Sequence, residues 1–335
     1  MDIIEYLEHT KPLLDKRINE IVASLHFPRL MLRQVEGGKR LRGALTLLTC
    51  EALGGNIEKA LDYAAAIEIV HAATLTHDDY IDKHKTRRGL KPLYIALDPR
   101  RAVLLGDMLM ASAIKYVKAE DGSKDALSDA IYDVSRGALL EPLNPFKFLK
   151  SLTQGTVVRE SYLVIIKLKT AVLFATASKL GAIAANSSLK EEAYKYGMSV
   201  GEAFQVADDI SDINKIIKGE TIDIGSLITL GPLVTYFAGI KEAILLIVNG
   251  LKILQDSNHH FPQDLIKVLE EIKTNALKFI NDRLEAAEKS LQPFPKNEYT
   301  DLLREFPYYA VEKMLEESNT KFTKLHETRQ ESPEL

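Results

Sequence analysis

The sequence predicts an all-α protein that folds as a single domain. Apolar residues recur at three- and four-residue steps from the start of the chain, which is the spacing of one face of a helix. Strand signals are scarce, because few β-branched runs alternate with polar residues and no Asn-Gly hairpin separates apolar segments. The 335 residues are 46% apolar and no Pro/Gly/Ser-rich linker divides them, so we expect one domain over residues 1–335 with a frayed tail from about residue 327.

Charge and cysteine content limit the possible partners. A net charge of -4 and a pI near 6.1 give no electrostatic reason to expect nucleic acid or an anionic membrane. Cys50 is the single cysteine, so no disulfide framework exists, and its apolar neighbours indicate an inert core thiol. The amino terminus is acidic and no apolar run reaches spanning length, so we expect a cytoplasmic protein without a stable membrane anchor.

The first expected elements are an amphipathic helix over residues 3–22 and a glycine-rich turn. In the turn, Gly37-Gly38-Lys39-Arg40-Leu41-Arg42-Gly43, a glycine pair opens a helix whose first turn carries three cations. Free N–H groups at a helix start favour anions, and Lys39 with Arg42 would add a phosphate clamp. Taken alone, an ordinary exposed basic turn is the simpler interpretation. An apolar helix is expected next, over residues 44–54.

A further helix begins near residue 57 and ends in an acidic motif, His77-Asp78-Asp79-Tyr80-Ile81-Asp82. On a helix Asp78 and Asp82 lie one turn apart, so their carboxylates share a face, with Asp79 beside them. Buried carboxylates need a partner, and three hard oxygen ligands suggest magnesium. By itself this motif is equally compatible with a solvated acidic helix end.

Beyond Arg87-Arg88-Gly89, a helix is expected over residues 104–113, and the prolines within residues 137–155 predict a break between helices or a loop. Lys169 and Thr170 then stand in an otherwise apolar helix. A lysine there is unfavourable unless it snorkels or meets an anion.

A second acidic motif, Gln205-Val206-Ala207-Asp208-Asp209-Ile210-Ser211-Asp212, repeats the three acids at the same spacing. Two such clusters facing each other across a cavity would hold magnesium ions on both sides of a diphosphate. Lys215 and Lys218 begin a looser segment that we expect to close over the cavity. The helical pattern returns from Pro232 onward.

Together these pieces resemble the trans-isoprenyl diphosphate synthase family over residues from about 37 to 223. The matching pieces are the GGKRxR turn, the ExxH ending at His71, DDxxD followed by RRG, Gly106-Asp107, Lys169-Thr170 and FQxxDDxxD. In combination they are highly specific. Within the family, the small residues and Gly137-Ala138 most resemble archaeal synthases with medium or long products, of the geranylgeranyl to hexaprenyl type. The resemblance implies antiparallel helices around a deep central cavity, a homodimer, and Mg²⁺ as about three ions bound with the substrate diphosphate.

The resemblance also implies the reaction: an allylic prenyl diphosphate ionises, its cation alkylates isopentenyl diphosphate, and a proton is lost. The implied metal ligands are Asp78, Asp79, Asp82, Asp208, Asp209 and Asp212. The implied contacts are Arg87, Lys169 and Lys218 for the allylic diphosphate, Lys39, Arg42, His71 and Arg88 for isopentenyl diphosphate, and Thr170 and Gln205 near the carbocation. Several have plainer alternatives: a core histidine for His71, helix-end neutralisation for Arg87 and Arg88, and a helix-interior amide for Gln205.

The chain departs from the family pattern at three places. Ala138 stands where the family usually has glutamine, Glu141 replaces an aspartate, and residues 225–229 lack the lysine of a GKxT segment. One diphosphate contact is therefore missing, and Lys215 or Lys218 would compensate for it.

Product length is expected to depend on the helix before Asp78. A prenyl tail anchored there runs beside turns that each rise about 5.4 Å. The side chains on this path are Ala73, Thr74, Val70, Ile69 and Ala66. None is aromatic, so we expect a product longer than C20, about C25 to C35.

Two other functions fit the same scaffold. A terpene cyclase would ionise one substrate and quench it internally, but it has no use for a second diphosphate site. A non-catalytic partner subunit of another synthase would be expected to carry an eroded acidic motif, whereas both motifs are intact.

Overall fold

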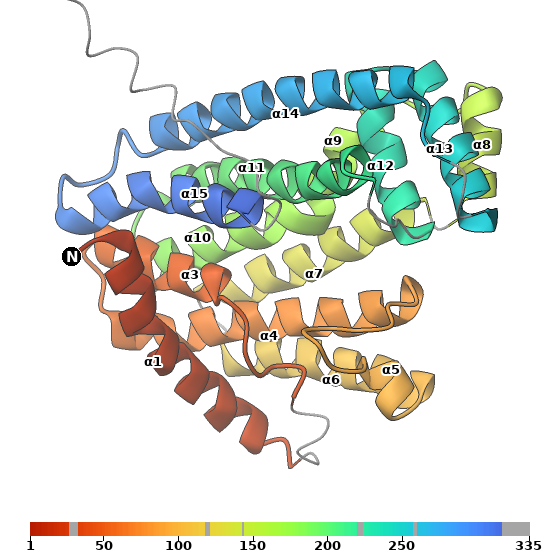
Figure 1. Ribbon diagram of the computed structural model, residues 1–335. Helices are drawn as coiled ribbons and strands as arrows, with labels where there is room; N and C mark the ends of the chain where they lie inside the picture. The colour runs from red at the N-terminus through yellow and green to blue at the C-terminus, as the bar shows by residue number, and fades with distance from the viewer. Residues whose placement is uncertain (27–32, 118–120, 143, 220–223, 257–259, 317–335) are drawn as a thin grey trace, which may run out of the picture. The chain divides into compact units, whose positions relative to one another are not determined.

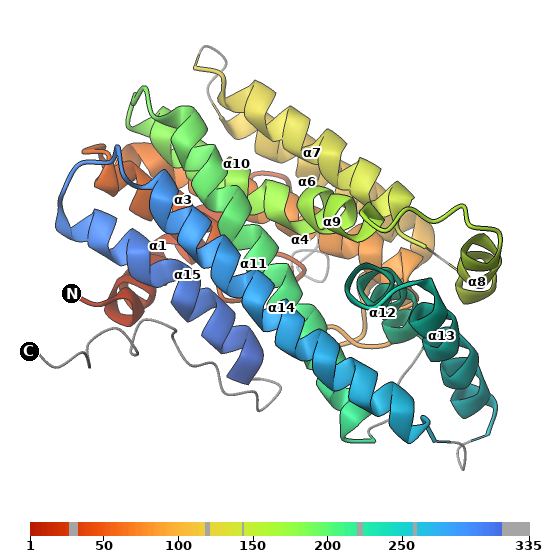
Figure 2. The same cartoon turned by 90° about the horizontal axis from the view of Figure 1, so that it is seen from above.

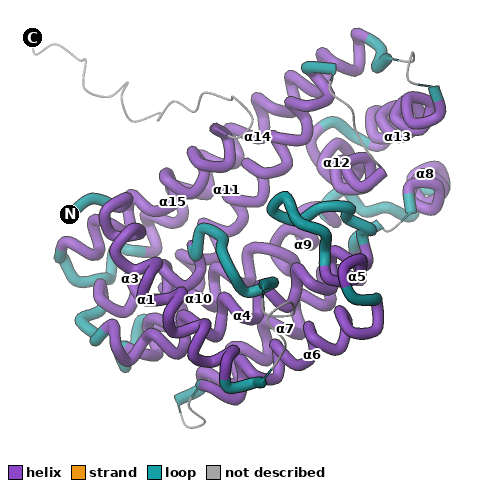
Figure 3. The backbone as a smooth tube through the Cα atoms, turned by 60° about the horizontal axis from the view of Figure 1, so that its bottom comes forward, coloured by secondary structure: helices purple, strands orange, loops and turns teal. Residues whose placement is uncertain are grey.

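The computed structural model describes residues 1–26, 33–117, 121–142, 144–219, 224–256 and 260–316. Within these ranges every regular element is a helix and no strand occurs, so the predicted all-α class is confirmed (Figure 3). None of the described helices is long and apolar enough to cross a membrane. The tail that we expected to fray from residue 327 lies outside the described residues.

Backbone contacts divide the chain into two compact units, so the expectation of one domain stays a prediction. The first unit is Met1–Leu143, Leu163–Glu202 and Ala286–Pro307, and the second is Asn144–Tyr162, Ala203–Glu285 and Tyr308–Leu335. Helices wholly in the first unit are α1 Ile3–Ala23, α3 Leu41–Ala52, α4 Ile57–Ile81, α5 Leu93–Ala96, α6 Pro99–Tyr116, α7 Ser123–Leu140, the π-helical turn η1 Lys167–Ala171 and α10 Val172–Ala184 (Figure 1). Those wholly in the second are α8 Pro145–Thr153, α12 Ile224–Phe237 and α13 Ile240–Gln255. Four helices contribute residues to both units: α9 Ser161–Ile166, α11 Lys190–Ile217, α14 Gln263–Ser290 and α15 Glu298–Glu316.

Helix α4 is the packing centre of the first unit. It contacts α1, α3, α5, α6, α7 and α10, and it runs beside α6 (Figure 1). Residues 64–70 are all buried; six of them are apolar, and the seventh, Glu68, is paired with Arg40 and the Gly43 N–H. The acidic end of α4 is therefore fixed by the whole unit rather than by its own loop.

In the second unit, α8, α12 and α13 pack together (Figure 2). Two glycines allow the close approach. A Cβ at Gly231 would lie 2.4 Å from the Phe148 ring, and one at Gly250 would lie 2.2 Å from Leu227. Any larger residue at these positions would displace the Phe148 or Leu227 side chain.

The break predicted over residues 137–155 is shorter in the structure. Helix α7 continues to Leu140, and α8 begins at Pro145 within the same stretch. The Asn144 side chain accepts hydrogen bonds from the backbone N–H groups of Phe146 and Lys147, at 2.9 and 3.1 Å. Proline at the first helical position loses no intrahelical hydrogen bond, so here it starts a helix instead of interrupting one.

Candidate active site

The first acidic motif occupies the last turn of α4, as predicted. Asp82 caps the helix, and its N–H donates to the Asp78 carbonyl at 2.8 Å. Burial raises the pKa of the Asp78 carboxyl to about 6, with Asp82 and Glu141 raising it and Lys169 lowering it. Asp78 therefore lies in a site where added positive charge stabilises its ionised form.

Asp79 has different partners from Asp78. Its side chain is 2% exposed, and its Oδ1 accepts hydrogen bonds from Nε and Nη2 of Arg87 at 2.9 and 2.6 Å. Burial raises the pKa of Asp79, but hydrogen bonds with His84 and Arg87 outweigh this effect and hold it below the usual range. Its Oδ2 is buried without a hydrogen-bond partner among the described residues. Asp79 thus orients Arg87, and its predicted role as a metal ligand stays a prediction.

Residues 87–90 form a tight turn that separates the two arginines. Backbone hydrogen bonds join Arg87 and Leu90 in both directions, at 2.8 and 3.0 Å. Arg88 and Gly89 have φ of 51° and 74°, the left-handed conformations of a type I′ turn. Arg87 therefore faces Asp79, while Arg88 extends to a different partner.

That partner is the Glu36 carbonyl, beside the glycine pair Gly37-Gly38. The Arg88 Nη1 donates to the Glu36 carbonyl at 2.6 Å. Gly38 has φ +93°, and a Cβ there would lie 2.8 Å from Arg88 Nη2. The structure thus brings together Arg88 and the turn that carries Lys39, two predicted parts of the isopentenyl diphosphate site.

His71 lies close to four arginines. Burial lowers the pKa of its ring well below the ordinary value, and the charges of Arg42, Arg88, Arg87 and Arg40 lower it further. The imidazole is therefore neutral at pH 7. This concentration of positive charge near the start of α3 favours an anion.

Arg42 is buried at the start of α3. Its guanidinium lies 4.5 Å from the centroid of the Phe174 ring, and its Nε has no hydrogen-bond partner among the described residues. Burial lowers its pKa to about 10. A buried cation with an unused donor is suited to bind an anionic ligand.

Arg40 and Glu68 were not assigned from sequence, although both belong to matching motifs, GGKRxR and ExxH. The Arg40 Nε donates to Asp15 Oδ1 at 2.7 Å, and its Nη1 lies 3.8 Å from Glu68 Oε2. Glu68 also accepts from the backbone N–H of Gly43 at 2.8 Å. These contacts fix the turn before α3 on α1 and α4.

Lys169 and Thr170 lie in η1, a π-helical turn before α10. Such turns are rare, and they occur frequently at functional sites. A Cβ at Gly137 would lie 2.8 Å from the Lys169 backbone nitrogen, so α7 can approach this turn only with glycine there. The helix expected around Lys169 is present, and it contains this π-helical turn.

The Lys169 ammonium is stabilised by carboxylates rather than by snorkelling. Its Nζ forms an ion pair with Glu141. Burial lowers the pKa of Lys169, but the charges of Glu141, Asp78 and Asp82 outweigh burial and raise it. Lys169 is therefore charged beside the first acidic motif, as its predicted role requires.

The second acidic motif lies on the part of α11 that belongs to the second unit. Asp209 is 2% exposed, and it accepts hydrogen bonds from the Tyr162 hydroxyl at 2.6 Å and the Gln205 amide at 3.0 Å. Burial raises the pKa of the Asp209 carboxyl to about 8, with a further contribution from Asp208. Tyr162 was missed, because it is 47 positions away and no local motif marks it.

The remaining predicted groups of this motif lie nearer the surface. Asp208 is exposed, Asp212 is 2.6 Å from Lys215 Nζ, and Lys218 is exposed just beyond α11. Gln205 also donates to Asp208 at 3.3 Å. Its amide therefore binds the motif's carboxylates, and its predicted place near a carbocation stays a prediction.

The side chains expected to limit product length are buried in α4. Ala66, Ile69, Val70 and Ala73 are each 0% exposed, and Thr74 is 7% exposed.

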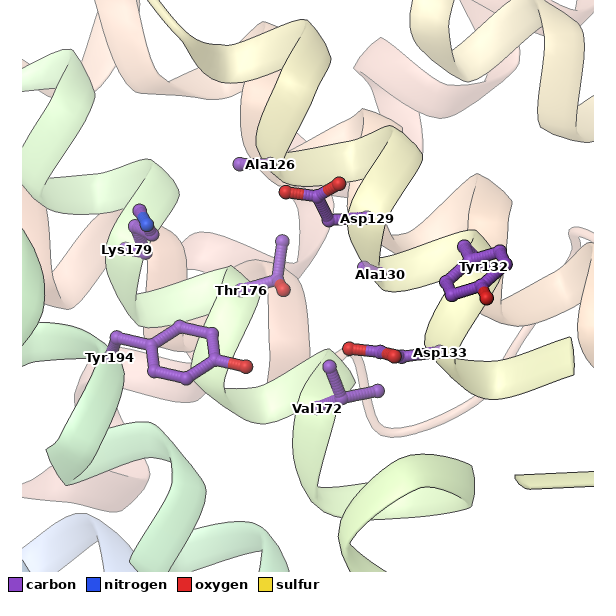
Figure 4. Close-up of a pocket in the computed structure, with 9 residues that line it drawn as sticks. All are labelled: Ala126, Asp129, Ala130, Tyr132, Asp133, Val172, Thr176, Lys179 and Tyr194. Carbon is purple, nitrogen blue, oxygen red and sulfur yellow. The ribbon is translucent and has the colours of Figure 1, made fainter. Parts of the chain in front are cut away.

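A separate cavity of about 230 Å³ in the first unit lies between α7, α10 and the start of α11 (Figure 4). It is lined by Ala126, Asp129, Ala130, Tyr132, Asp133, Val172, Thr176, Lys179 and Tyr194, none of which is a predicted site residue.

The acidic motifs fit magnesium held jointly with a substrate. Among the described residues, no group of three or more His, Cys, Asp or Glu side chains is placed to hold a metal by itself. Magnesium takes few protein carboxylates and completes its shell with water and phosphate oxygens. The ionised carboxylate of Asp78, whose pKa is raised to about 6 by burial, would be stabilised by such an ion.

The helical fold and its two acidic motifs are typical of isoprenoid synthases, and comparison with known proteins gives the family. Residues 27–221 match the polyprenyl synthetase family. The chain belongs to this family, and the predicted trans-prenyltransferase activity is confirmed at that level.

Individual relatives span different products. The chain is 34% identical to a short chain isoprenyl diphosphate synthase of Methanothermobacter thermautotrophicus over 64% of its own length and 67% of the relative. It is 28% identical to a geranylgeranyl pyrophosphate synthase of Geoglobus acetivorans, over 93% of this chain and 99% of that relative. The crystal structure of a Caulobacter crescentus polyprenyl synthase complexed with calcium and isoprenyl diphosphate matches with a TM-score of 0.71 and 25% identity, over 92% of this chain and 97% of that one.

Proposed function

We propose that this enzyme condenses isopentenyl diphosphate with an allylic prenyl diphosphate in a magnesium-dependent reaction. The observation that carries the proposal is the buried guanidinium of Arg42 at the start of α3, whose Nε has no hydrogen-bond partner among the described residues. We take it as part of an anion site distinct from the carboxylates of Asp78 and Asp82. A reaction that binds two diphosphates, of which one leaves, needs both kinds of site.

The two sites would treat their diphosphates differently. Lys39, Arg42, His71 and Arg88 would hold isopentenyl diphosphate, whose diphosphate stays bonded to its carbon. Arg87, Lys169 and Lys218 would bind the allylic diphosphate, and Thr170 and Gln205 would stabilise the carbocation left behind. Preorganised cations are effective here because charge develops on the departing oxygen in the transition state.

Each acidic motif would hold magnesium together with the allylic diphosphate. The proposed ligands, direct or through water, are Asp78, Asp79, Asp82, Asp208, Asp209 and Asp212. Magnesium, when bound, would neutralise the negative charge that builds on the leaving diphosphate. The Caulobacter crescentus relative, complexed with calcium and isoprenyl diphosphate, supports this proposal.

The product is proposed to be longer than C20, about C25 to C35, because none of the five side chains on the proposed path along α4 is aromatic. The proposed floor consists of Ala73, Thr74, Val70, Ile69 and Ala66.

We also propose a homodimer. Leu104 and Met108, one turn apart on α6, are 49% and 48% exposed and provide an apolar contact face.

Incubation of the purified protein with magnesium, labelled isopentenyl diphosphate and an allylic primer tests the proposal. Elongated prenyl diphosphate is expected. A cyclic hydrocarbon would instead identify a terpene cyclase, and no product with primers of 10, 15 or 20 carbons, about two to four isoprene units, would favour a partner subunit.

A further inference from the structure

Glu141 makes a contact that the proposed reaction does not use. Its carboxylate forms an ion pair with Lys169 Nζ, and the two side chains are only 12% and 23% exposed. Ion pairs in such partly buried positions are stronger than surface pairs, because solvent screens them less. The contact therefore competes with any other anion for Lys169.

The backbone fixes both partners of this pair. Glu141 caps the end of α7, and its N–H donates to the Gly137 carbonyl at 3.1 Å. Gly137 in turn lies against η1, since a Cβ there would be 2.8 Å from the Lys169 backbone nitrogen. Glu141 is therefore presented to Lys169 by the same close contact that holds α7 on the π-helical turn.

Two other carboxylates, Asp78 and Asp82, also attract Lys169. They differ from Glu141 in one respect, because they are proposed metal ligands. A magnesium ion would neutralise their attraction for Lys169 when the substrate binds. Glu141 would remain as the charge that still holds the lysine.

We propose that Glu141 is a positioning residue that holds Lys169 between turnovers and competes with diphosphate for it. This inference rests on the proposed function, because it takes Lys169 as a contact of the allylic diphosphate. When the diphosphate arrives, Lys169 exchanges one anion for another. When pyrophosphate leaves, Glu141 recaptures the lysine and so favours release.

The sign of the effect distinguishes this role from a purely structural one. Glu141→Gln keeps the shape of the side chain but removes the competing charge. Pyrophosphate should then bind more tightly, by about fivefold, the order expected for loss of one partly exposed ion pair. A residue that only maintained the fold would weaken binding when replaced.

The test is titration calorimetry with sodium pyrophosphate in the absence of magnesium, paired with pyrophosphate inhibition of the magnesium-loaded enzyme. Glu141→Gln should lower both the Kd and the inhibition constant by about fivefold, with a lower KM for the allylic primer and a lower kcat. Asp129→Asn is the matched control, because it removes one negative charge from the same helix at a position that lines the cavity of Figure 4. It should leave all four values unchanged.

A double variant links the effect to Lys169. In a Lys169→Gln background, the added Glu141→Gln change should no longer tighten pyrophosphate binding. If Glu141→Gln does not fold, as judged by circular dichroism, Glu141→Ala should give a change in the same direction.

Two results would overturn the inference: unchanged or weaker pyrophosphate binding in the Glu141 variants, or tightening that persists without Lys169. Failure of the proposed function is a separate result. It would appear as a wild-type protein that makes no elongated product.

Discussion

Replacing Gly38 with alanine should damage one diphosphate site and leave the other intact. The new Cβ would lie 2.8 Å from Nη2 and 3.3 Å from Cζ of Arg88. An ordinary carbon contact requires about 3.5 Å, so the guanidinium must move. It cannot move without straining its hydrogen bond to the Glu36 carbonyl, which is 2.6 Å long.

The expected magnitude has two parts. A non-glycine residue at φ +93° costs about 1 to 2 kcal/mol of stability. Displacement of Arg88 should also remove part of a charge-assisted contact with isopentenyl diphosphate, about 1 to 1.5 kcal/mol. That loss corresponds to a rise of about fivefold to tenfold in the KM for isopentenyl diphosphate.

Gly54→Ala separates these two parts. Gly54 also has a left-handed backbone, with φ +78°, but a Cβ there would meet nothing within 4 Å. Both variants should lose similar stability in thermal unfolding. In steady-state kinetics only Gly38→Ala should raise the KM for isopentenyl diphosphate, while the KM for the allylic primer stays constant. An equal rise in both variants, or no rise in Gly38→Ala, would refute the placement of Arg88.

Three further predictions concern the metal site, the basic turn and the product. Burial raises the pKa of Asp78 to about 6, so the folded state binds this proton more tightly than the unfolded state, and ionised Asp78 destabilises the fold above pH 6. Asp78→Asn should therefore raise the free energy of unfolding at pH 8 by about 1 to 2 kcal/mol, and this gain in stability should shrink toward pH 4. Asp78→Asn and Asp208→Ala should both lose turnover. Normal turnover of either variant at saturating magnesium would exclude the metal site. Lys39→Ala should raise the KM for isopentenyl diphosphate more than that for the allylic primer, and equal effects would mean that the two pockets are wrongly assigned. Ala73→Phe should shorten the product to C20 or less without loss of condensation, and an unchanged chromatographic profile would exclude α4 as the floor.

The sequence was most informative where a local pattern determines a local structure. The periodic apolar residues predicted α1 and the course of α4, including the acidic motif at its end. The glycines before Lys39 predicted a turn at the start of α3, and Gly37 and Gly38 do have positive φ. Proline was misleading at residue 145, because its effect depends on whether it stands inside a helix or at its first position.

Within the candidate site, spacing placed the acidic residues on the correct helix but did not reveal their partners. Helical geometry put Asp78 and Asp82 one turn apart, yet it could not show that Asp79 contacts Arg87, eight positions further on. Tyr162 and Asp209 are 47 positions apart, so no short motif connects them. These contacts depend on how segments pack, which single-sequence periodicity does not contain.

Lys169 illustrates why a local conflict in a sequence can identify a functional position. A lysine between apolar residues contradicts the helix pattern, and the contradiction is resolved by η1, by Gly137 and by Glu141. A structure that needs a π-helical turn, a glycine and an ion pair to place one ammonium group gives that group a defined position. Leucine at 169 would satisfy the helix pattern but leave the partly buried carboxylate of Glu141 without this partner, so the ion pair gives the lysine a structural role. Its charge beside Asp78 is also what the proposed allylic diphosphate site requires.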